Sequence, residues 1–201
     1  MKKFIAAGLA LCMAFMLAAC GASPSSTASQ AGSGTSAAAD GSAVTIKLGG
    51  IGPITGSTAV YGEAVMNGAQ IAVDEINASD SAVKFEYNFQ DDEGDAETAV
   101  NAYNILKDWG MQVLMGTVTT APCLAVISET EADNMFQITP SASSTDVIVP
   151  DNVFQVCFTD PNQGVSAADY IADNGLATKV AAIYDSSDAY SSGIYNAFAA
   201  E

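Results

Sequence analysis

Strand-like and helix-like segments alternate along the sequence from residue 44 onward, and this alternation is what most restricts the fold. Residues 44–51 show the every-second-residue apolar pattern of a strand, and residues 58–77 show helical spacing. One face of that predicted helix carries Val65, Ala69, Ala72 and Ile76. Repeated units of this kind predict an α/β fold with a doubly wound parallel sheet and right-handed crossovers.

The same alternation continues further along the chain. Residues 83–89 alternate strictly, as a strand should, and Asp95 is placed to cap the helix that follows. The apolar face of that helix holds Ala99, Tyr103 and Leu106. Further strands are predicted at 111–115, 135–139, 153–158 and 179–184, and further helices at 121–133, 162–173 and from about 190. In a fold with strand order 2-1-3-4-5, the binding crevice opens between the first and third strands.

The first twenty residues predict an exported lipoprotein. Lys2 and Lys3 precede an apolar run up to Leu17, which is too short for an ordinary membrane span and is typical of a signal peptide. The run closes on Leu-Ala-Ala-Cys, which resembles a lipobox and implies removal of residues 1–19 and a lipid on Cys20. The alternative is an uncleaved membrane anchor with an incidental cysteine.

The rest of the chain is expected to comprise three regions. Residues 20–43 hold Cys20 and a flexible tether of Ser, Ala and Gly, which cannot bury enough apolar area to fold. Residues 44–160 are predicted to form an N-terminal ligand-binding lobe, and residues 161–201 the start of a second lobe. The final GIYNAFAAE has no helix stop signal, so we expect a truncated protein that binds ligand more weakly than a complete one.

The chain is strongly acidic, with a formal net charge of −17 and no histidine. This charge argues against nucleic acid or anionic lipid surfaces as partners, and the solubility of an exported protein explains it. The run Asp91, Asp92, Glu93 and Asp95 suggests a calcium loop, but Ala96 stands where an EF-hand-like loop needs glycine. A solvated turn and helix cap is the preferred interpretation, and no metal or cofactor is predicted.

Two of the predicted strands, at 111–115 and 135–139, run directly into clusters of hydroxyl side chains. The clusters are Thr117, Thr119 and Thr120 after the first strand, and Thr139, Ser141, Ser143 and Ser144 after the second. Because the carboxyl ends of parallel strands meet at one edge of a sheet, we expect both clusters at the edge where small ligands bind. Without a histidine base or a G-x-S-x-G elbow, this edge is suited to holding a polar molecule rather than hydrolysing it.

Six segments in series carry a resemblance to a known family: IKLGGIGPITGSTAVYGEAVMNGAQIAVDEIN, DDEGDAETAVNAYNIL, GTVTTAPCLAV, ITPSASSTD, NVFQVCFTDPNQG and VAAIYDSSDAYSSG. Residues 44–201 resemble the extracytoplasmic solute-binding lipoproteins of ABC importers, specifically the branched-chain amino acid (leucine/isoleucine/valine) binding family of type I periplasmic-binding fold. The resemblance implies two α/β lobes that close on an amino acid and deliver it to ABC permease subunits. It implies no enzymatic activity, and with Cys20 it implies a protein anchored by lipid outside the cytoplasm.

The resemblance also implies roles for the two hydroxyl loops. The family's first loop grips the ligand carboxylate, which implies that role for Thr119 and Thr120, where a helix N-terminus would favour an anion. The alternative is that both threonines are ordinary helix caps. The family's second loop takes the ligand ammonium, which implies the Ser141 carbonyl and the Ser143 hydroxyl. The alternative there is a turn started by Pro140 with solvated serines.

Three further positions match the family pattern. Tyr61 resembles the aromatic residue set against the ligand side chain, although a plain packing role is a close alternative. Asp160 stands at the crossing to the second lobe and could offer its charge to an ammonium group, but capping of the next helix is the preferred interpretation. Tyr190 resembles a residue of the second lobe that closes over the ligand.

The cysteines and the ligand stay open on sequence grounds. Some family members join the carboxylate loop to the acidic loop by a disulfide, but Thr119 and Gly94 stand at those positions here. Cys123 and Cys157 either form a different disulfide or are small buried residues. The favoured ligand is a branched-chain amino acid, while relatives take amides, aromatic amino acids or urea-like solutes. A sensory receptor of the same fold is the main alternative function, and an exported hydrolase is the weaker one.

Overall fold

The computed structural model describes residues 43–201. The predicted signal peptide, the lipidation of Cys20 and nearly all of the predicted tether lie outside the described residues. Within the part of the chain that is described, no helix is long and apolar enough to cross a membrane.

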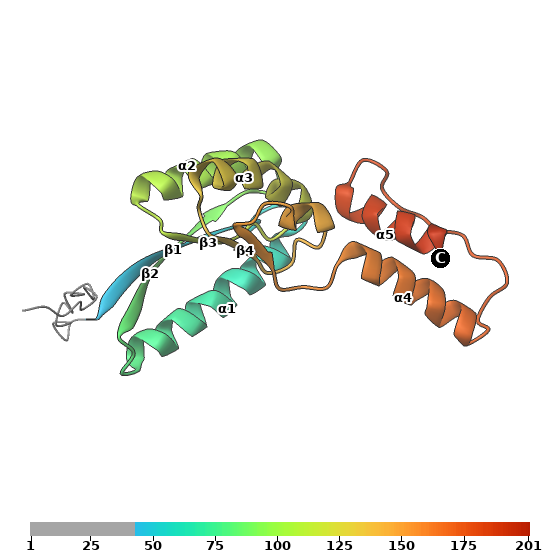
Figure 1. The fold of residues 1–201 in the computed structure, drawn as a ribbon, viewed down its shortest axis with the longest axis horizontal. Helices are drawn as coiled ribbons and strands as arrows, with labels where there is room; N and C mark the ends of the chain where they lie inside the picture. Colours follow the sequence, from blue (N-terminus) through green and yellow to red (C-terminus); the bar gives the residue numbers. More distant parts are fainter. Residues whose placement is uncertain (1–42) are drawn as a thin grey trace, which may run out of the picture. The chain divides into compact units, whose positions relative to one another are not determined.

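Five strands form one sheet in the order β2-β1-β3-β4-β5 (Figure 1). They are β1 Val44–Gly52, β2 Val83–Asp91, β3 Val113–Gly116, β4 Gln137–Thr139 and β5 Val153–Gln155. Every pair of neighbouring strands is parallel. The predicted fold class is therefore confirmed, and the strand order is the one for which the sequence places the crevice between the first and third strands, because the winding direction changes between β1 and β3.

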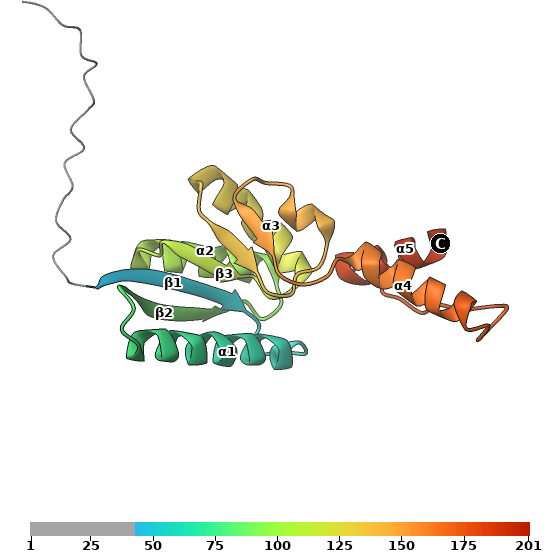
Figure 2. The ribbon, with the colours of Figure 1, turned by 60° about the horizontal axis from the view of Figure 1, so that its bottom comes forward.

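Helices lie on both faces of the sheet, with α2 and α3 on one side and α1 on the other (Figures 1 and 2). Their bounds are α1 Ala59–Ala78, α2 Ala96–Trp109, α3 Thr120–Asp133, the 3-10 turn η1 Thr145–Ile148, α4 Asp160–Asp173 and α5 Ala189–Ala200. Asp95 caps α2 as predicted, because its carboxylate accepts the backbone N–H of Thr98 at 2.9 Å. Gly110 then ends α2 in the left-handed conformation, with φ 89°.

The main apolar core lies between the sheet and α2. Ala99, Tyr103 and Leu106 are fully buried, which confirms the predicted inner face of α2. Ile51 from β1 and Leu114 from β3 meet them from the sheet, and both are fully buried as well. Burial of this apolar surface at roughly 25 cal/mol per Å² is the main force that holds α2 on the sheet.

Two glycines of β1 let neighbouring side chains lie directly on the backbone of the central strand. A Cβ atom on Gly49 would stand 2.1 Å from the Met111 sulfur on the α2 side. On the opposite side, a Cβ atom on Gly50 would stand 2.4 Å from the Phe89 ring. Side chains at these positions of β1 would therefore push Met111 and Phe89 out of place.

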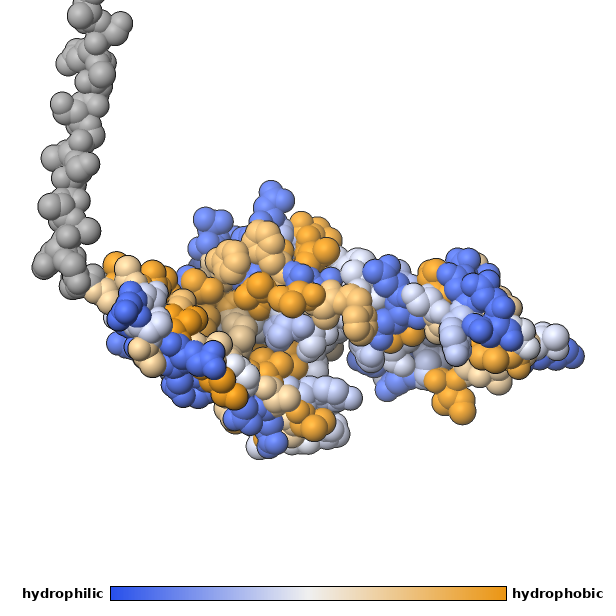
Figure 3. Space-filling model, turned by 90° about the horizontal axis from the view of Figure 1, so that it is seen from below, coloured by the Kyte–Doolittle hydropathy of each residue, from blue (hydrophilic) through white to orange (hydrophobic). Residues whose placement is uncertain are grey.

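The face of the sheet on the α1 side is only partly covered by the described residues. α1 packs on β1 and β2, whereas the strands beyond carry half-buried or exposed apolar side chains on this face. We call this group the open apolar face: Val113, Met115, Phe136, Ile138 and Phe154. The Phe136 and Phe154 rings are stacked, with centroids 5.1 Å apart. Figure 3 views the molecule from the side of α1 and shows apolar residues at the surface.

The region after residue 159 consists of two helices that pack tightly on each other. A Cβ atom on Gly164 of α4 would stand 2.5 Å from the Ile194 carbonyl oxygen of α5. The sequence predicted a strand at 179–184, and this prediction is wrong for the described chain, where residues 179–185 form no strand. A strand needs a neighbour for its backbone hydrogen bonds, and these residues have no strand beside them in the described part.

Three smaller predictions are also corrected. In α1, Ala72 was expected on the inner face, but it is exposed, and the adjacent Val73 is the residue that is buried there. The strand predicted at 111–115 begins only at Val113, because Met111 packs into the core and its N–H donates to the Leu106 carbonyl at 3.0 Å. The strand predicted at 153–158 ends at Gln155.

Candidate functional site at the carboxyl edge of the sheet

The loop between β3 and α3 presents a helix N-terminus with a free hydroxyl. Thr119 holds the N-cap position of α3, as the capping interpretation expected, but its side chain makes no capping hydrogen bond. Its Oγ1 atom is buried and has no hydrogen-bond partner among the described residues. The first backbone N–H groups of a helix also lack partners within the helix, so this position is suited to a negatively charged group.

Thr120 is bound to the second hydroxyl loop. Its side chain is 4% exposed, and its Oγ1 atom accepts the backbone N–H of Ser143 at 3.3 Å. Thr139, which ends β4, adds a second link because its hydroxyl donates to the Thr117 carbonyl at 2.7 Å. The two hydroxyl loops therefore lie side by side and are tied together by hydrogen bonds, as expected from their places at the ends of β3 and β4.

The serines of the second loop are more constrained than a solvated turn would be. The Ser141 hydroxyl donates to the Val118 carbonyl, although the residue as a whole is exposed. Ser143 is 2% exposed, and its hydroxyl donates to Oδ1 of Asp160 at 2.6 Å. The interpretation of these residues as solvated serines is therefore wrong for Ser143.

Asp160 is the first residue of α4 and is almost completely buried, with 1% of its surface exposed. The preferred interpretation as a helix cap is corrected, because Thr159 holds the N-cap position and accepts the Asn162 N–H at 3.4 Å. The backbone N–H of Asp160 donates to the Ser143 carbonyl at 2.8 Å. Burial raises the pKa of Asp160, the Ser143 hydrogen bond lowers it, and the charge of Asp188 raises it further.

The two aromatic candidates are both accessible. Tyr61 lies in the first turn of α1 and is 61% exposed, so a buried packing role is excluded in this structure. Tyr190 lies in the first turn of α5, is 42% exposed and donates to Oε1 of Gln163 at 3.3 Å. Partial burial raises the pKa of Tyr190, and the charge of Asp160 and the nearby Tyr61 add to the effect.

Asp91, the last residue of β2 and the first of the acidic run, holds the loop after β1 in place, a role that the sequence did not reveal. Oδ1 of Asp91 accepts the Ile54 N–H at 2.9 Å, and Oδ2 accepts the Thr55 hydroxyl at 2.6 Å. Partial burial raises the pKa of Asp91, but the hydrogen bonds from Thr55, Ile54 and Glu93 outweigh this and lower it. The loop that follows β1 is thereby fixed to the carboxyl end of β2.

Asp92 is the next residue after Asp91 and is fully buried. Its Oδ1 atom accepts the Gly94 N–H at 2.8 Å, while its Oδ2 atom has no hydrogen-bond partner within residues 43–201. Burial raises the pKa of Asp92 to about 6, and the charges of Asp91 and Asp95 contribute. Among residues 43–201, no three acidic, cysteine or histidine side chains come together as a group that could hold a metal ion.

Both described cysteines are free thiols. Cys123 is buried next to the second hydroxyl loop, in a small core cluster with Ala142 and Val147, and burial raises its pKa to about 11. Cys157 is half-buried, and its sulfur contacts the Ala142 carbonyl at 3.6 Å. The sequence left two alternatives, a disulfide between Cys123 and Cys157 or small buried residues. In the structure there is no disulfide between them, and Cys123 is a small buried residue.

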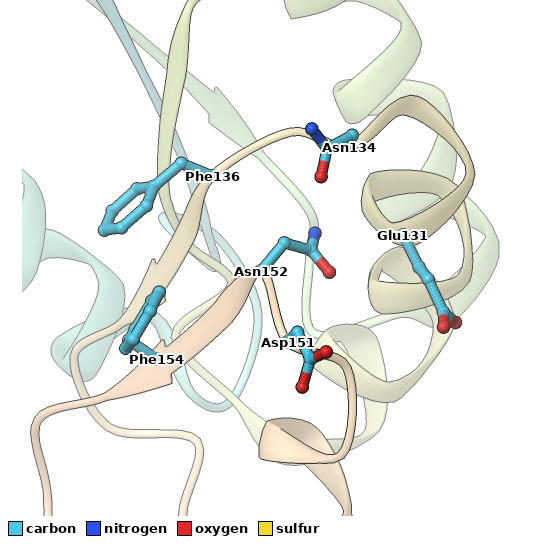
Figure 4. A pocket seen from close by; sticks show the side chains of 6 residues that line it. All are labelled: Glu131, Asn134, Phe136, Asp151, Asn152 and Phe154. Carbon is cyan, nitrogen blue, oxygen red and sulfur yellow. The ribbon is translucent and has the colours of Figure 1, made fainter.

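A hollow at the opposite edge of the sheet is distinct from the hydroxyl loops. Figure 4 shows the residues that line it: Glu131, Asn134, Phe136, Asp151, Asn152 and Phe154. They lie at the end of α3 and around the amino-terminal ends of β4 and β5, whereas Thr119 and Ser143 follow the carboxyl ends of β3 and β4. In open α/β sheets, ligands bind outside the carboxyl ends of the strands, so we place the candidate site at the hydroxyl loops.

Comparison with known proteins adds a family match. The model of the family described as "Periplasmic binding protein" matches residues 45–201. The Leu/Ile/Val-binding protein homolog 3 of Brucella melitensis is 34% identical over 159 residues, which cover 77% of this chain and 43% of that protein. A Leu/Ile/Val-binding protein of Rhizobium johnstonii shows the same identity and coverage.

Two solved structures of binding proteins have a similar fold over the matched residues. A leucine binding protein from Thermotoga maritima matches with a TM-score of 0.72 and 28% identity, over 77% of this chain and 45% of that one. A branched-chain amino acid transporter substrate binding protein from Streptococcus pneumoniae, in complex with isoleucine, matches with a TM-score of 0.73 and 29% identity, over 78% and 46%. The chain spans less than half the length of the relatives that it matches.

Proposed function

The chain belongs to the periplasmic binding protein family, and from this premise we propose that it is part of an extracytoplasmic solute-binding protein of an ABC importer. Its ligand is an amino acid, most simply a branched-chain one, which the protein delivers to membrane permease subunits. Identities of 34% with two Leu/Ile/Val-binding proteins support this proposal. The observation that carries it is the pair of hydrogen-bonded hydroxyl loops at the carboxyl edge of the sheet.

The ligand carboxylate is held at the N-terminus of α3. The Thr119 hydroxyl is the strongest candidate, because it is unpartnered and stands at the positive end of the helix. Thr120 contributes by holding the neighbouring loop, since its own Oγ1 atom already accepts the Ser143 N–H. A carboxylate in this place would supply the acceptor that the free N–H groups and the Thr119 hydroxyl lack.

The ligand ammonium is held by the second loop. The Ser141 carbonyl accepts no hydrogen bond from the described residues, and the Ser143 hydroxyl already donates its hydrogen bond to Asp160. Both oxygens are therefore acceptors, which is what an ammonium group needs. Tyr61 and Tyr190 are accessible aromatic rings that can pack against an aliphatic side chain.

Calorimetric titration of the full-length gene product with L-leucine, L-isoleucine and L-valine tests the proposal. We expect saturable binding of at least one of them. Two analogues serve as matched controls: 4-methylpentanoate lacks the amine of leucine, and 3-methylbutylamine lacks the carboxylate. Both should bind much more weakly than leucine. Absence of binding to any amino acid, together with binding of an amide or urea-like solute, would replace the proposed ligand class.

The anchoring and the partner are further parts of the proposal. A lipid on Cys20 would hold the protein at the outer surface of the membrane, where a permease can receive the ligand. Mass spectrometry of the protein from membranes should find the lipid on Cys20, and a Cys20→Ser variant should appear in the soluble fraction. Genes for a permease and an ATPase beside this one would favour transport over the sensory alternative.

A further inference from the structure

Asp160 is a buried acid without a cation. Its surface is 1% exposed, and its Oδ2 atom has no hydrogen-bond partner among the described residues. The only ion pair found in residues 43–201 joins Lys107 to Asp133, so no lysine of this region neutralises Asp160. A buried carboxylate is costly unless a positive charge or several donors compensate it. A further positive group near this carboxylate would therefore stabilise its ionised form.

Neighbouring residues cover both carboxylate oxygens of Asp160, so a positive group can interact with it only through one of these residues. On one side, a Cβ atom on Gly193 of α5 would stand 2.8 Å from Oδ2, so α5 covers that oxygen closely. On the other side, Oδ1 receives the Ser143 proton at 2.6 Å and a weaker contact from the Gln163 amide at 3.5 Å. A ligand at the hydroxyl loops would therefore not contact Asp160 directly. The Asp160 carboxylate would act on it through its hydrogen bond with the Ser143 hydroxyl.

The hydrogen bonds of Ser143 leave it with a single remaining function. Its backbone N–H is used by Thr120 and its carbonyl by the N–H of Asp160. Its hydroxyl proton is committed to the Asp160 carboxylate. Only the lone pairs of the hydroxyl oxygen are left, and these accept a hydrogen bond but cannot donate one. A donor bound to an ionised acceptor is also polarised, which makes its oxygen a better acceptor for a cation.

We propose that Asp160 is the positioning residue that makes the site selective for a primary ammonium group, by holding the Ser143 hydroxyl as an acceptor and polarising its oxygen through their hydrogen bond. This inference rests on the proposed function. It differs from the earlier expectation that Asp160 offers its charge directly to the ligand. It also explains why a carboxylate is buried beside α5 with no cation from the described chain.

The test compares ligand selectivity in Asp160→Asn and wild-type full-length protein by calorimetry. Asparagine keeps the shape and can still accept the Ser143 proton, but it lacks the charge. The Kd for L-leucine should rise at least tenfold, while the Kd for 4-methylpentanoate should change less than twofold. Asp188→Asn is the matched control, because it removes a nearby acidic charge without contacting Ser143. Its Kd for leucine should change less than threefold.

Ser143→Ala provides a second, independent measurement. If Asp160 acts through Ser143, the double variant should bind leucine no more than twofold more weakly than Ser143→Ala alone. Additive losses would overturn the inference, and so would an equal weakening of leucine and 4-methylpentanoate by Asp160→Asn, which would reveal a purely structural role. Failure of the wild-type protein to bind any amino acid would instead refute the proposed function itself.

Discussion

The hydroxyl of Thr130 donates a 2.7 Å hydrogen bond to Oε1 of Gln137, and both side chains are completely buried. The amide nitrogen of Gln137 donates in turn to the Gly116 carbonyl at 2.7 Å. This pair joins α3, β4 and the end of β3 directly beneath the first hydroxyl loop. The polar atoms are satisfied, so the interior tolerates them, and their directional bonds fix the end of β3 where the candidate site begins.

Replacing Gln137 by leucine should lower the free energy of unfolding by about 2–3 kcal/mol, because the Gly116 carbonyl loses its buried donor and the Thr130 hydroxyl keeps only its 3.2 Å hydrogen bond to the Ile127 carbonyl. Urea denaturation followed by circular dichroism measures this change. Thr130→Val together with Gln137→Leu should cost less than the sum of the single variants, since they share one hydrogen bond. Strict additivity would mean that the two side chains do not interact in solution.

Gly50→Ala should destabilise the protein, by about 1–3 kcal/mol, because the new methyl group would stand 2.4 Å from the Phe89 ring on the next strand. Gly68→Ala is the matched control: it lies within α1 and has nothing within 4 Å of the added carbon. That variant should be more stable than wild type by about 0.5–1 kcal/mol, since alanine is the better helix former. Thermal unfolding of both variants would show opposite shifts in Tm.

Asp92 should make stability depend on pH in the range from about 4 to about 6. Burial raises its pKa from the ordinary 3.8 to about 6, so the native state binds the proton more tightly than the unfolded chain. Its contribution is therefore fully present below pH ~4 and is lost as the pH rises through about 6. Relative to Asp92→Asn, wild-type protein should gain about 2 kcal/mol on going from pH 7.5 to pH 4.5.

Asp91→Asn provides the control of opposite sign. The pKa of Asp91 lies below its ordinary value, so its stabilising effect is present at neutral pH and is lost as the pH falls. Denaturant unfolding at several pH values separates the two carboxylates. Parallel pH profiles of wild type and Asp92→Asn would show that the buried carboxyl group does not titrate in this range.

Thr119→Val should separate ligand binding from stability. The hydroxyl makes no hydrogen bond within the described residues, so its removal should change the free energy of unfolding by less than about 0.5 kcal/mol. The affinity for L-leucine should fall about tenfold, equivalent to ~1.4 kcal/mol, if this hydroxyl binds the carboxylate. Calorimetry with 3-methylbutylamine, which has no carboxylate, should show no difference between variant and wild type.

Much of the fold could be predicted because local patterns and the overall structure agree. The alternation of strands and helices, the strand order and the inner face of α2 with Tyr103 are all present. The errors occur where tertiary contacts decide. Ala72 and Val73 are adjacent apolar residues, and the packing of α1 on the sheet determines which one turns inward. A strand at 179–184 depends on a partner strand, which no local pattern supplies.

The location of the site was predictable from the sequence, but the hydrogen-bond partners of its side chains were not. The ends of β3 and β4 bring Thr119 and Ser143 to one edge, as the sequence indicated. Which hydroxyl is free and which is committed depends on partners distant in the chain, such as Asp160, seventeen positions after Ser143. The hydrogen bonds that Asp91 accepts from Ile54 and Thr55 were not predicted, because these partners lie in another loop, more than thirty residues away.

The open apolar face has a practical consequence for work with residues 43–201 on their own. The exposed rings of Phe136 and Phe154 favour self-association through this surface, whereas the excess of acidic residues makes copies of the chain repel one another. Added salt screens the repulsion within about 10 Å at 0.1 M and leaves the apolar attraction intact. Dilute buffer should therefore keep this material dispersed, and rising ionic strength should drive it into reversible clusters.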